Sequence, residues 1–346
     1  MPLKVAMVGP FSEQLTEGGV EHHVYYLAEN LEKRGVGVER WSWKIPRDTA
    51  KIRRMSLLKI DDVIHKSDAD IIHLHSTATA AAFLANLKDP KKKFVSTIHA
   101  FFHSELEQSL RMKIISTTLS YPYCETLKRI RNNIAVSSFV KREALDLGIS
   151  VRAIIGNGVP LENMKDVKPN DELKSDVLLV ARLSKQKGVL DFITAFSNSG
   201  LKATLIGYGD ERMEERVTEE CAAGGITAII RPERKVVLSA MKSTQVFAFP
   251  SKRETFGITA LEAMALGKPV VVYKTAEGPL DFIRNDYNGL VIENTPAALR
   301  KGAERVLKDK NLQETLSINA LNTAKRYDWP NIAKKVEEFY YDVLAK

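Results

Sequence analysis

The segment from Pro250 to Pro269, PSKRETFGITALEAMALGKP, carries the residue types best suited to chemistry. Glu254 precedes a predicted helix that begins near Gly257, and Glu262 lies within that helix. A helix start presents free backbone N–H groups and the positive end of a dipole, so it attracts anions. Glycine lets a phosphate approach the backbone closely. We therefore expect one carboxylate to meet a sugar and the other to meet ribose hydroxyls, with a solvated helix carboxylate as the alternative for Glu262.

A basic loop, VARLSKQKG, follows a predicted strand further up the chain and contains Arg182 and Lys187. Arginine offers a planar fork and lysine a point charge, and both suit phosphate oxygens. A basic surface loop is the alternative, but a position beyond a strand end favours a phosphate site. Charge stabilisation at a departing phosphate is the kind of interaction that usually dominates such catalysis.

Glycines and histidines mark possible sites in the first half of the chain. Gly18 and Gly19 lie at a strand-to-helix turn, which suits close approach to a phosphate or a sugar. His99 ends an apolar strand, and histidine titrates near neutral pH, so it could act as an acid or a base. Four further histidines fit surface, capping, core or loop roles at least as well: His22, His23, His73 and His75.

These motifs need a scaffold, and the chain alternates strand and helix patterns. Short β-rich runs predict strands at Lys4–Val8, Asp70–His75, Lys93–Ile98, Asn133–Val136, Asp176–Ala181, Lys202–Ile206, Ala228–Arg231, Val246–Pro250 and Pro269–Tyr273. Helical patterns cover Val20–Arg34, Ile52–Lys66, Thr79–Leu87, Glu105–Arg131, Val189–Ser197, Arg212–Ala223, Gly257–Leu266 and Trp329–Leu344. Such alternation predicts an α/β fold with parallel sheets, whose ligands bind beyond the carboxyl ends of the strands.

The alternation restarts after a Gly-, Pro- and Asn-rich segment, Gly156–Asn170. We therefore predict two doubly wound domains, residues 1–160 and 161–328, that share a site in the cleft between them. The last helix, within 329–346, has apolar residues at helical spacing and must pack on something. Periodicity alone leaves open which domain it covers, and one arrangement packs it back onto the first.

The pattern of two glutamates around the helix start, with PS before it and EAMA-x-GKPVV after it, resembles the retaining glycosyltransferases of the GT-B fold, specifically glycosyltransferase family 4. The resemblance covers nearly the whole chain and implies two Rossmann-like domains facing a central cleft. It also implies that Glu254 contacts the donor sugar near the reacting carbon and that Glu262 binds the ribose. The backbone N–H groups of Phe256, Gly257 and Ile258 would then hold the diphosphate.

The same resemblance extends to the other motifs. Arg182 and Lys187 match an Arg-Leu…Lys-Gly element that neutralises the diphosphate leaving group. Gly18 and Gly19 match a turn of the first, acceptor-side domain that faces the donor phosphates, and His99 matches a histidine that contacts the donor sugar. One departure is the sequence EGPLD after the strand that ends at position 273, where the family often has Gly-Gly-x-x-Glu.

The combined interpretation is a metal-independent, retaining glycosyltransferase. It would move a hexose from a nucleoside-diphosphate sugar, UDP- or GDP-linked, to a hydroxyl of a lipid, a lipid-linked glycan or a small molecule, with no cofactor beyond that donor. A nucleotide-sugar epimerase or hydrolase of the same fold is an alternative, although no residue is evidently dedicated to proton movement at the sugar ring. A nucleic-acid-binding protein is a third reading, which rests on charge alone.

The chain of 346 residues has 51 Lys and Arg against 43 Asp and Glu, a net charge of +8. Its first 160 residues hold 23 against 17, so most of the excess lies on the acceptor side and favours an anionic lipid or membrane surface. Two cysteines, Cys124 and Cys221, fit a reducing compartment. No signal peptide or membrane span is recognisable, which predicts a cytoplasmic protein that can also contact the cytoplasmic face of the membrane. No sequential metal motif is recognisable either, which predicts that there is no metal site.

Overall fold

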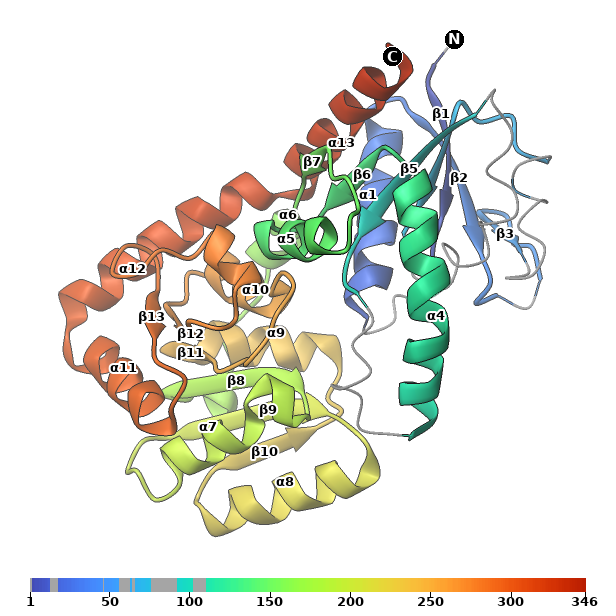
Figure 1. The fold of residues 1–346 in the computed structure, drawn as a ribbon. Helices are drawn as coiled ribbons and strands as arrows, with labels where there is room; N and C mark the ends of the chain where they lie inside the picture. The colour runs from blue at the N-terminus through green and yellow to red at the C-terminus, as the bar shows by residue number, and fades with distance from the viewer. Residues whose placement is uncertain are drawn as a thin grey trace. The chain divides into compact units, whose positions relative to one another are not determined.

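The computed structural model describes residues 2–12, 18–45, 47–55, 63, 66–75, 92–101 and 110–346. The chain forms two compact units. Unit 1 comprises Met1–Gly158 together with Trp329–Lys346, and unit 2 comprises Val159–Asp328. Each unit has its own parallel sheet and its own helices (Figure 1).

The sheet of unit 1 has the strand order β3-β2-β1-β4-β5-β6-β7, and every pair in it is parallel. Its central strands are apolar and buried because helices cover them. The strands are β1 (Lys4–Val8), β2 (Gly37–Ser42), β3 (Ile52–Arg54), β4 (Ile71–Leu74), β5 (Lys93–Ile98), β6 (Asn133–Ala135) and β7 (Ala153–Ile154).

The described helices of unit 1 are α1 (Gly19–Lys33), α4 (Leu110–Arg129), α5 (Ser138–Asp146) and α13 (Trp329–Leu344). Helix α1 ends where Gly35 takes a φ of +86°, a left-handed conformation that glycine adopts without strain. Helix α13 packs against α1: the rings of Trp329 and Tyr26 stack with centroids 5.8 Å apart, and Arg34 pairs with Glu337. The C-terminal helix therefore covers unit 1, which the sequence left open.

The sheet of unit 2 has the order β10-β9-β8-β11-β12-β13, again with parallel pairs. The order reverses between β8 and β11, which makes their carboxyl ends the expected ligand-binding edge. The strands are β8 (Val177–Arg182), β9 (Ala203–Tyr208), β10 (Thr227–Ile230), β11 (Val246–Phe249), β12 (Val270–Tyr273) and β13 (Leu290–Ile292).

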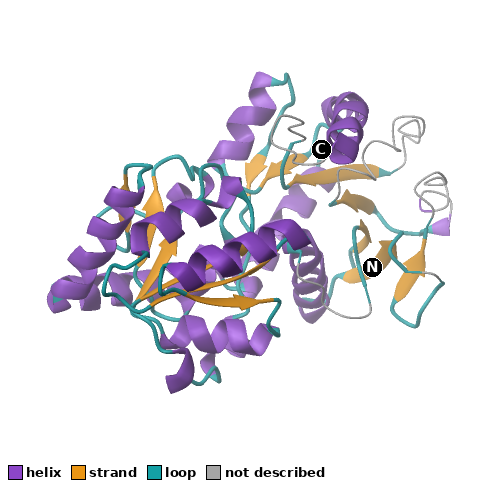
Figure 2. Ribbon diagram, turned by 90° about the horizontal axis from the view of Figure 1, so that it is seen from below, coloured by secondary structure: helices purple, strands orange, loops and turns teal. Residues whose placement is uncertain are grey.

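Helices lie on both faces of the unit 2 sheet (Figure 2). They are α6 (Leu161–Lys165), α7 (Val189–Phe196), α8 (Glu211–Ala223), α9 (Arg234–Ser243), α10 (Ile258–Ala265), α11 (Pro296–Lys308) and α12 (Lys310–Ala324), with short 3-10 turns η3 (Asp171–Leu173), η4 (Lys185–Lys187), η5 (Gly278–Asp281) and η6 (Lys325–Tyr327). Side-chain caps fix several helix starts: Asp210 accepts from Met213 N, and Thr295 accepts from Ala298 N. The core between helices and sheet includes Phe192, all of whose side chain is buried.

Two doubly wound parallel sheets confirm the predicted fold class. One predicted helix is wrong at its start, because Ile52–Arg54 is strand β3 and pairs with β2. Pairing with a distant strand outweighs the local helical pattern, and Arg53 also packs its guanidinium over the Trp41 ring, 5.2 Å from the centroid. The predicted helix Thr79–Leu87 lies outside the described residues. Within the described ranges, no helix is long and apolar enough to cross a bilayer.

Candidate functional site

The basic loop and the glutamate loop of unit 2 are held together beyond the ends of β8 and β11. Arg182 is the exposed last residue of β8. Lys252 N donates to Gln186 O at 2.8 Å, which ties the loop after β11 to turn η4. Gly188 follows that turn with a φ of +67°, and an added Cβ would lie 2.8 Å from the carbonyl carbon of Pro250. Only glycine permits this approach of the two backbones.

The consequence is a direct ion pair between two of the sequence-predicted residues. Lys187 Nζ lies 2.6 Å from Glu254 Oε2, and the two side chains are 23% and 13% exposed. The other carboxylate oxygen, Oε1, accepts from Thr255 N at 3.1 Å. Both oxygens of Glu254 are therefore oriented, and a cation stands beside a carboxylate at the edge of the sheet where a ligand is expected.

The start of α10 lies directly after this pair. Gly257 caps the helix with a φ of +90°, and an added Cβ would lie 2.5 Å from Pro279 Cγ. Gly278, in the EGPLD segment, packs so closely that its Cβ would lie 2.6 Å from Phe256 N, and its own N donates to Glu254 O at 3.0 Å. The single glycine of that segment therefore preserves a close contact with the glutamate loop. The helix start offers backbone N–H groups and a positive dipole end to an anion.

Glu262 is 2% exposed, so a solvated helix carboxylate is the wrong interpretation. Arg234, the first residue of α9, binds the Glu262 carboxylate through both terminal nitrogens. Its Nη1 lies 3.2 Å from Oε2, and its Nη2 pairs with Oε1. The Arg234 side chain is 43% exposed. Sequence reasoning missed Arg234, and the only signal was a basic residue at a helix start, with no spacing that links it to Glu262.

The remaining predicted residues lie in unit 1. Gly18 is the N-cap of α1 and Gly19 its first residue, and no side chain among the described residues caps this helix start. His99 follows β5 and is half-buried, with its ring centroid 4.6 Å from that of His23. His23 is 2% exposed, so the surface or capping role expected for it is wrong. Its Nδ1 bonds Asn157 Oδ1 at 2.6 Å.

His73 and His75 are buried and form a histidine cluster with His23 and the half-buried His99; the ring centroids of His73 and His75 are 3.9 Å apart. His73 bonds Tyr340 OH at 2.6 Å and Thr97 Oγ1 at 2.8 Å, which is the core role that the sequence allowed. Burial lowers the pKa of His23 to about 4 and holds the pKa values of the other three well below the usual range. The cluster is therefore neutral at pH 7 and offers hydrogen bonds and lone pairs rather than charge.

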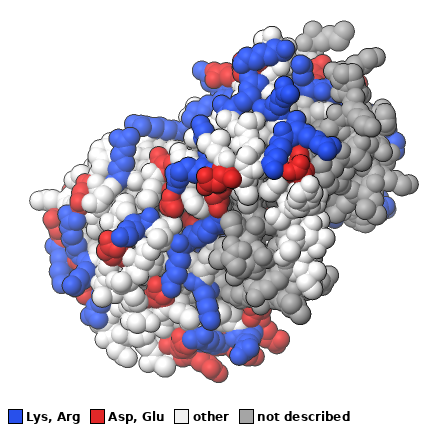
Figure 3. Space-filling view, in the orientation of Figure 1, with Lys and Arg blue, Asp and Glu red and all other residues white. Residues whose placement is uncertain are grey.

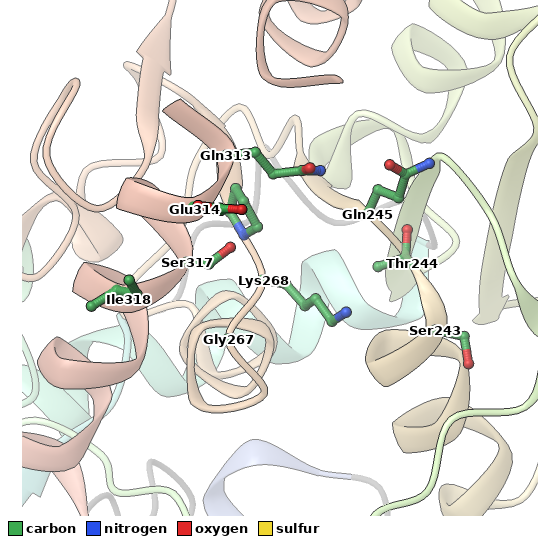
Figure 4. Close-up of a pocket in the computed structure, with 10 residues that line it drawn as sticks. Ser243, Thr244, Gln245, Gly267, Lys268, Gln313, Glu314, Ser317 and Ile318 are labelled. Carbon is green, nitrogen blue, oxygen red and sulfur yellow. The ribbon is translucent and has the colours of Figure 1, made fainter. Parts of the chain in front are cut away.

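A separate pocket of about 430 Å³ lies at the opposite edge of the unit 2 sheet (Figure 4). Its lining comes from the segments that precede β11 and β12 and from α12: Ser243, Thr244, Gln245, Gly267, Lys268, Pro269, Gln313, Glu314, Ser317 and Ile318. Burial, with a smaller contribution from Lys242, lowers the pKa of Lys268 to about 8. Because the pocket lies at the amino ends of the strands, it is distinct from the Lys187–Glu254 site.

Two family models match consecutive parts of the chain: Glycosyltransferase Family 4 over residues 17–163, and Glycosyl transferases group 1 over residues 161–323. The chain belongs to the glycosyltransferases. It is 25% identical over 384 residues to the phosphatidyl-myo-inositol mannosyltransferase of Mycobacterium leprae, covering 99% of this chain and 98% of that protein. The corresponding protein of Mycolicibacterium smegmatis is 25% identical over 378 residues, with coverages of 99% and 94%.

Solved structures show that the fold of this glycosyltransferase is GT-B. Sucrose-phosphate synthase from Thermosynechococcus elongatus superimposes with a TM-score of 0.81 at 18% identity, covering 99% of this chain and 100% of that one. Anabaena HepE, solved in complex with UDP-glucose, gives a TM-score of 0.77 at 16% identity, with coverages of 98% and 100%. The predicted family is therefore confirmed, whereas the roles of the individual site residues stay predictions.

Proposed function

We propose that this glycosyltransferase moves a hexose from a nucleoside-diphosphate sugar to a hydroxyl acceptor, with retention at the anomeric carbon and without a metal ion or other cofactor. The observation that carries the proposal is the Lys187–Glu254 pair beside the start of α10, at the point where the strand order of unit 2 reverses. This arrangement combines positive charge and free N–H groups for a diphosphate with a carboxylate for the sugar.

In this proposal the leaving group is stabilised from two sides. Arg182 and Lys187 neutralise the charge that develops on the departing diphosphate, while the N–H groups of Phe256, Gly257 and Ile258 bind its oxygens. Glu254 contacts the sugar near the reacting carbon. Since Glu254 also fixes Lys187, it determines where the lysine presents its charge. The departing phosphate can itself take the proton of the acceptor hydroxyl.

Glu262 binds the ribose hydroxyls in this proposal, with Arg234 in place. An ionised carboxylate has about four lone-pair sites, so ribose hydroxyls can donate to Glu262 while the guanidinium stays bound. Arg234 then holds the buried carboxylate in a fixed orientation. The Anabaena neighbour binds UDP-glucose in its solved structure, which supports a UDP-linked donor, and a GDP-linked donor remains the alternative.

Gly18, Gly19 and His99 act on the same donor from unit 1 in this proposal. The backbone at Gly18 and Gly19 would approach the phosphates at the start of α1 once the Glu21 carboxylate, which lies against Gly18 and pairs with Lys44, turns away. His99 contacts a sugar hydroxyl. A neutral imidazole suits that contact because it donates from one nitrogen and accepts at the other.

We propose a lipid or lipid-linked hydroxyl as the acceptor, at the cytoplasmic face of an anionic membrane. The mycobacterial relatives are named as phosphatidyl-myo-inositol mannosyltransferases, which supports a lipid. Helix α4 exposes Ile114 and Tyr121, 59% and 74% of whose areas are accessible, and it ends in Lys128 and Arg129. Apolar side chains beside basic ones suit the surface of an anionic bilayer. Among the described residues on the face shown in Figure 3, however, Lys and Arg are interspersed with acids.

The first experiment is a thermal-shift screen with UDP, GDP, ADP and dTDP, because a ligand of the folded state raises its apparent stability. The stabilising nucleotide then defines the donor for a transfer assay, in which NMR reads the anomeric configuration of the product. Glu254→Gln and Lys187→Ala should each lower transfer by about two to three orders of magnitude, as expected when a key electrostatic contact is lost.

Lys252→Ala is the matched control, since this lysine lies in the same loop but pairs with Asp191 at 3.1 Å. It should keep most of the activity, and a chelator should not lower the wild-type rate. Near-normal turnover in Glu254→Gln or Lys187→Ala would overturn the assignment of the site. Free sugar or an epimer as the sole product would overturn the transfer reaction.

A further inference from the structure

Three imidazoles of unit 1 converge on one buried point. His23, His75 and His99 each present a ring nitrogen, and these nitrogens all lie within 4.8 Å of one another. His23 belongs to α1, while His75 and His99 directly follow β4 and β5. No sequential motif links the three positions, so metal-binding spacings in the sequence could not reveal them.

The fold dictates this convergence. Strands β4 and β5 are adjacent and parallel, so the residues that follow them emerge at the same edge of the sheet. Helix α1 approaches that edge because Gly9, after β1, has no side chain. An added Cβ at Gly9 would lie 2.8 Å from Val24 Cγ1 and 3.5 Å from the Cβ of His75.

Four ring nitrogens of the trio make no hydrogen bond to the described residues. They are buried, and they comprise His23 Nε2, both nitrogens of His75 and His99 Nε2. A buried polar atom without a partner is costly, so several of them on three neighbouring side chains indicate a missing ligand. His73, the fourth member of the cluster, is different because both its nitrogens are bonded.

The tautomer of His23 is set for ligation. Its Nδ1 lies 2.6 Å from Asn157 Oδ1, an oxygen that only accepts, so the proton is on Nδ1 and the lone pair is on Nε2. Metal-bound histidines almost always have this second partner, a carbonyl or carboxylate that accepts from the non-ligating nitrogen. His23 therefore keeps its lone pair on Nε2, a buried atom without a hydrogen-bond partner among the described residues.

We propose that His23, His75 and His99 form a site for a borderline transition-metal ion, Zn²⁺ above all. Three neutral imidazoles with a water as fourth ligand are a known tetrahedral set for Zn²⁺, whereas Mg²⁺ and Ca²⁺ require oxygen ligands. Zn–N bonds of about 2.1 Å place the nitrogens roughly 3.4 Å apart. The trio, now within 4.8 Å, reaches that geometry by small side-chain rotations.

The charge of the site determines how it would be used. The trio contains no carboxylate or thiolate, so the charge of the ion stays uncompensated by its protein ligands. Occupancy of the site would then depend on the concentration of free Zn²⁺, and its effect on transfer would act through His99. This consequence rests on the proposed function: an ion that holds His99 withdraws it from the donor sugar, so Zn²⁺ inhibits transfer without being part of the reaction.

The test uses the full chain with no polyhistidine tag. Titration with Co²⁺, followed by its visible absorption, and calorimetry with Zn²⁺ should give one ion per chain. His23→Gln and His75→Gln, which replace a ligand by a poor one of similar size, should each weaken binding at least tenfold. His22→Gln is the matched control, because this neighbouring histidine lies outside the trio with its ring 6.1 Å from that of Tyr26, and it should bind as the wild type does.

X-ray absorption of the Zn²⁺-loaded wild type settles the ligand set even if a variant misfolds. Three imidazoles and one lighter oxygen ligand are expected. Absence of binding, unchanged binding in His23→Gln and His75→Gln, or sulfur in the shell from Cys124 or Cys221 would each overturn the site. A protein that binds Zn²⁺ at the trio but transfers no sugar would support the metal site while refuting the proposed function, so the two failures are distinguishable.

Discussion

Gly188 offers the sharpest test of how the donor-side loops are held together. It caps α7 with a φ of +67°, and an added Cβ would lie 2.8 Å from the carbonyl carbon and 2.9 Å from the Cβ of Pro250. Gly200 is its matched control in the same unit. It has a φ of +77°, and an added Cβ would meet nothing within 4 Å. The effect of alanine on stability at the two positions should therefore differ only through the close approach to Pro250 at Gly188.

The expected costs follow from these two environments. A left-handed conformation costs alanine about 1–2 kcal/mol, and the reduced freedom of the unfolded chain returns about 0.4–1 kcal/mol. Gly200→Ala should therefore lose about 1 kcal/mol. Gly188→Ala bears the same cost, but its Cβ would also overlap the carbonyl oxygen of Pro250, the nearest atom, so the two loops must separate. Such overpacking adds about 1–3 kcal/mol, for a total of about 2–4 kcal/mol.

The assay must report on unit 2 by itself. Trp41, Trp43 and Trp329 all belong to unit 1, so tryptophan fluorescence follows unit 1 alone. Hydrogen exchange of the peptide that contains β11 gives the opening free energy of unit 2. It should fall by about 2–4 kcal/mol in Gly188→Ala and by about 1 kcal/mol in Gly200→Ala, while the fluorescence transition stays unchanged in both.

Equal losses in the two variants would refute the reasoning, because the backbone conformation alone would then explain them. A second readout follows the site itself. Separating the loops moves Lys187 away from Glu254, so Gly188→Ala should weaken binding of the stabilising nucleoside diphosphate. Gly200→Ala should bind it as the wild type does.

Two further predictions concern single charged groups. Arg234→Met leaves the buried carboxylate of Glu262 without its guanidinium and should lower the opening free energy of unit 2 by about 2 kcal/mol. The loss is smaller than for a fully buried pair because the Arg234 side chain is 43% exposed. An unchanged opening free energy would show that the pair contributes nothing to stability. Lys268 has its pKa lowered to about 8 in the folded state, so between pH 8 and 10 the unfolded chain binds more protons, and this group makes stability rise with pH. Wild type should therefore gain stability relative to Lys268→Met on going from pH 7 to pH 9.5 in hydrogen-exchange measurements, and parallel profiles would contradict the lowered pKa.

The strands buried on both faces were predictable because their signal is local. Lys4–Val8 and Lys93–Ile98 are apolar runs with the same bounds in the structure, and Trp329–Leu344 has helical spacing throughout. Strand β2, with the sequence GVERWS, escaped prediction because it mixes polar and apolar residues near a sheet edge. Strand β3 was mistaken for a helix because its conformation depends on pairing with β2 rather than on its own residues.

In the candidate site, too, some features could be predicted from the sequence and others could not. Glu254, Lys187 and Gly257 lie in short motifs, so residue type and spacing sufficed to select them. The contacts between these residues could not be predicted from the sequence, because the Lys187–Glu254 pair joins positions 67 residues apart. The ion pair between Arg234 and Glu262 could not be predicted either, because it depends on where the start of α9 lies relative to α10. Long-range packing, which no local pattern records, decides these contacts.

The placement of α13 has a consequence for the order in which the protein matures on the ribosome. Unit 2, Val159–Asp328, is continuous in the chain, whereas unit 1 receives its last helix only after unit 2 has been synthesised. Until then His73 lacks the hydroxyl of Tyr340, and the surface of α1 that packs on Trp329 is uncovered. We therefore expect the second-synthesised unit to complete its fold before the first, and chaperones that act on nascent chains to meet the uncovered face of α1.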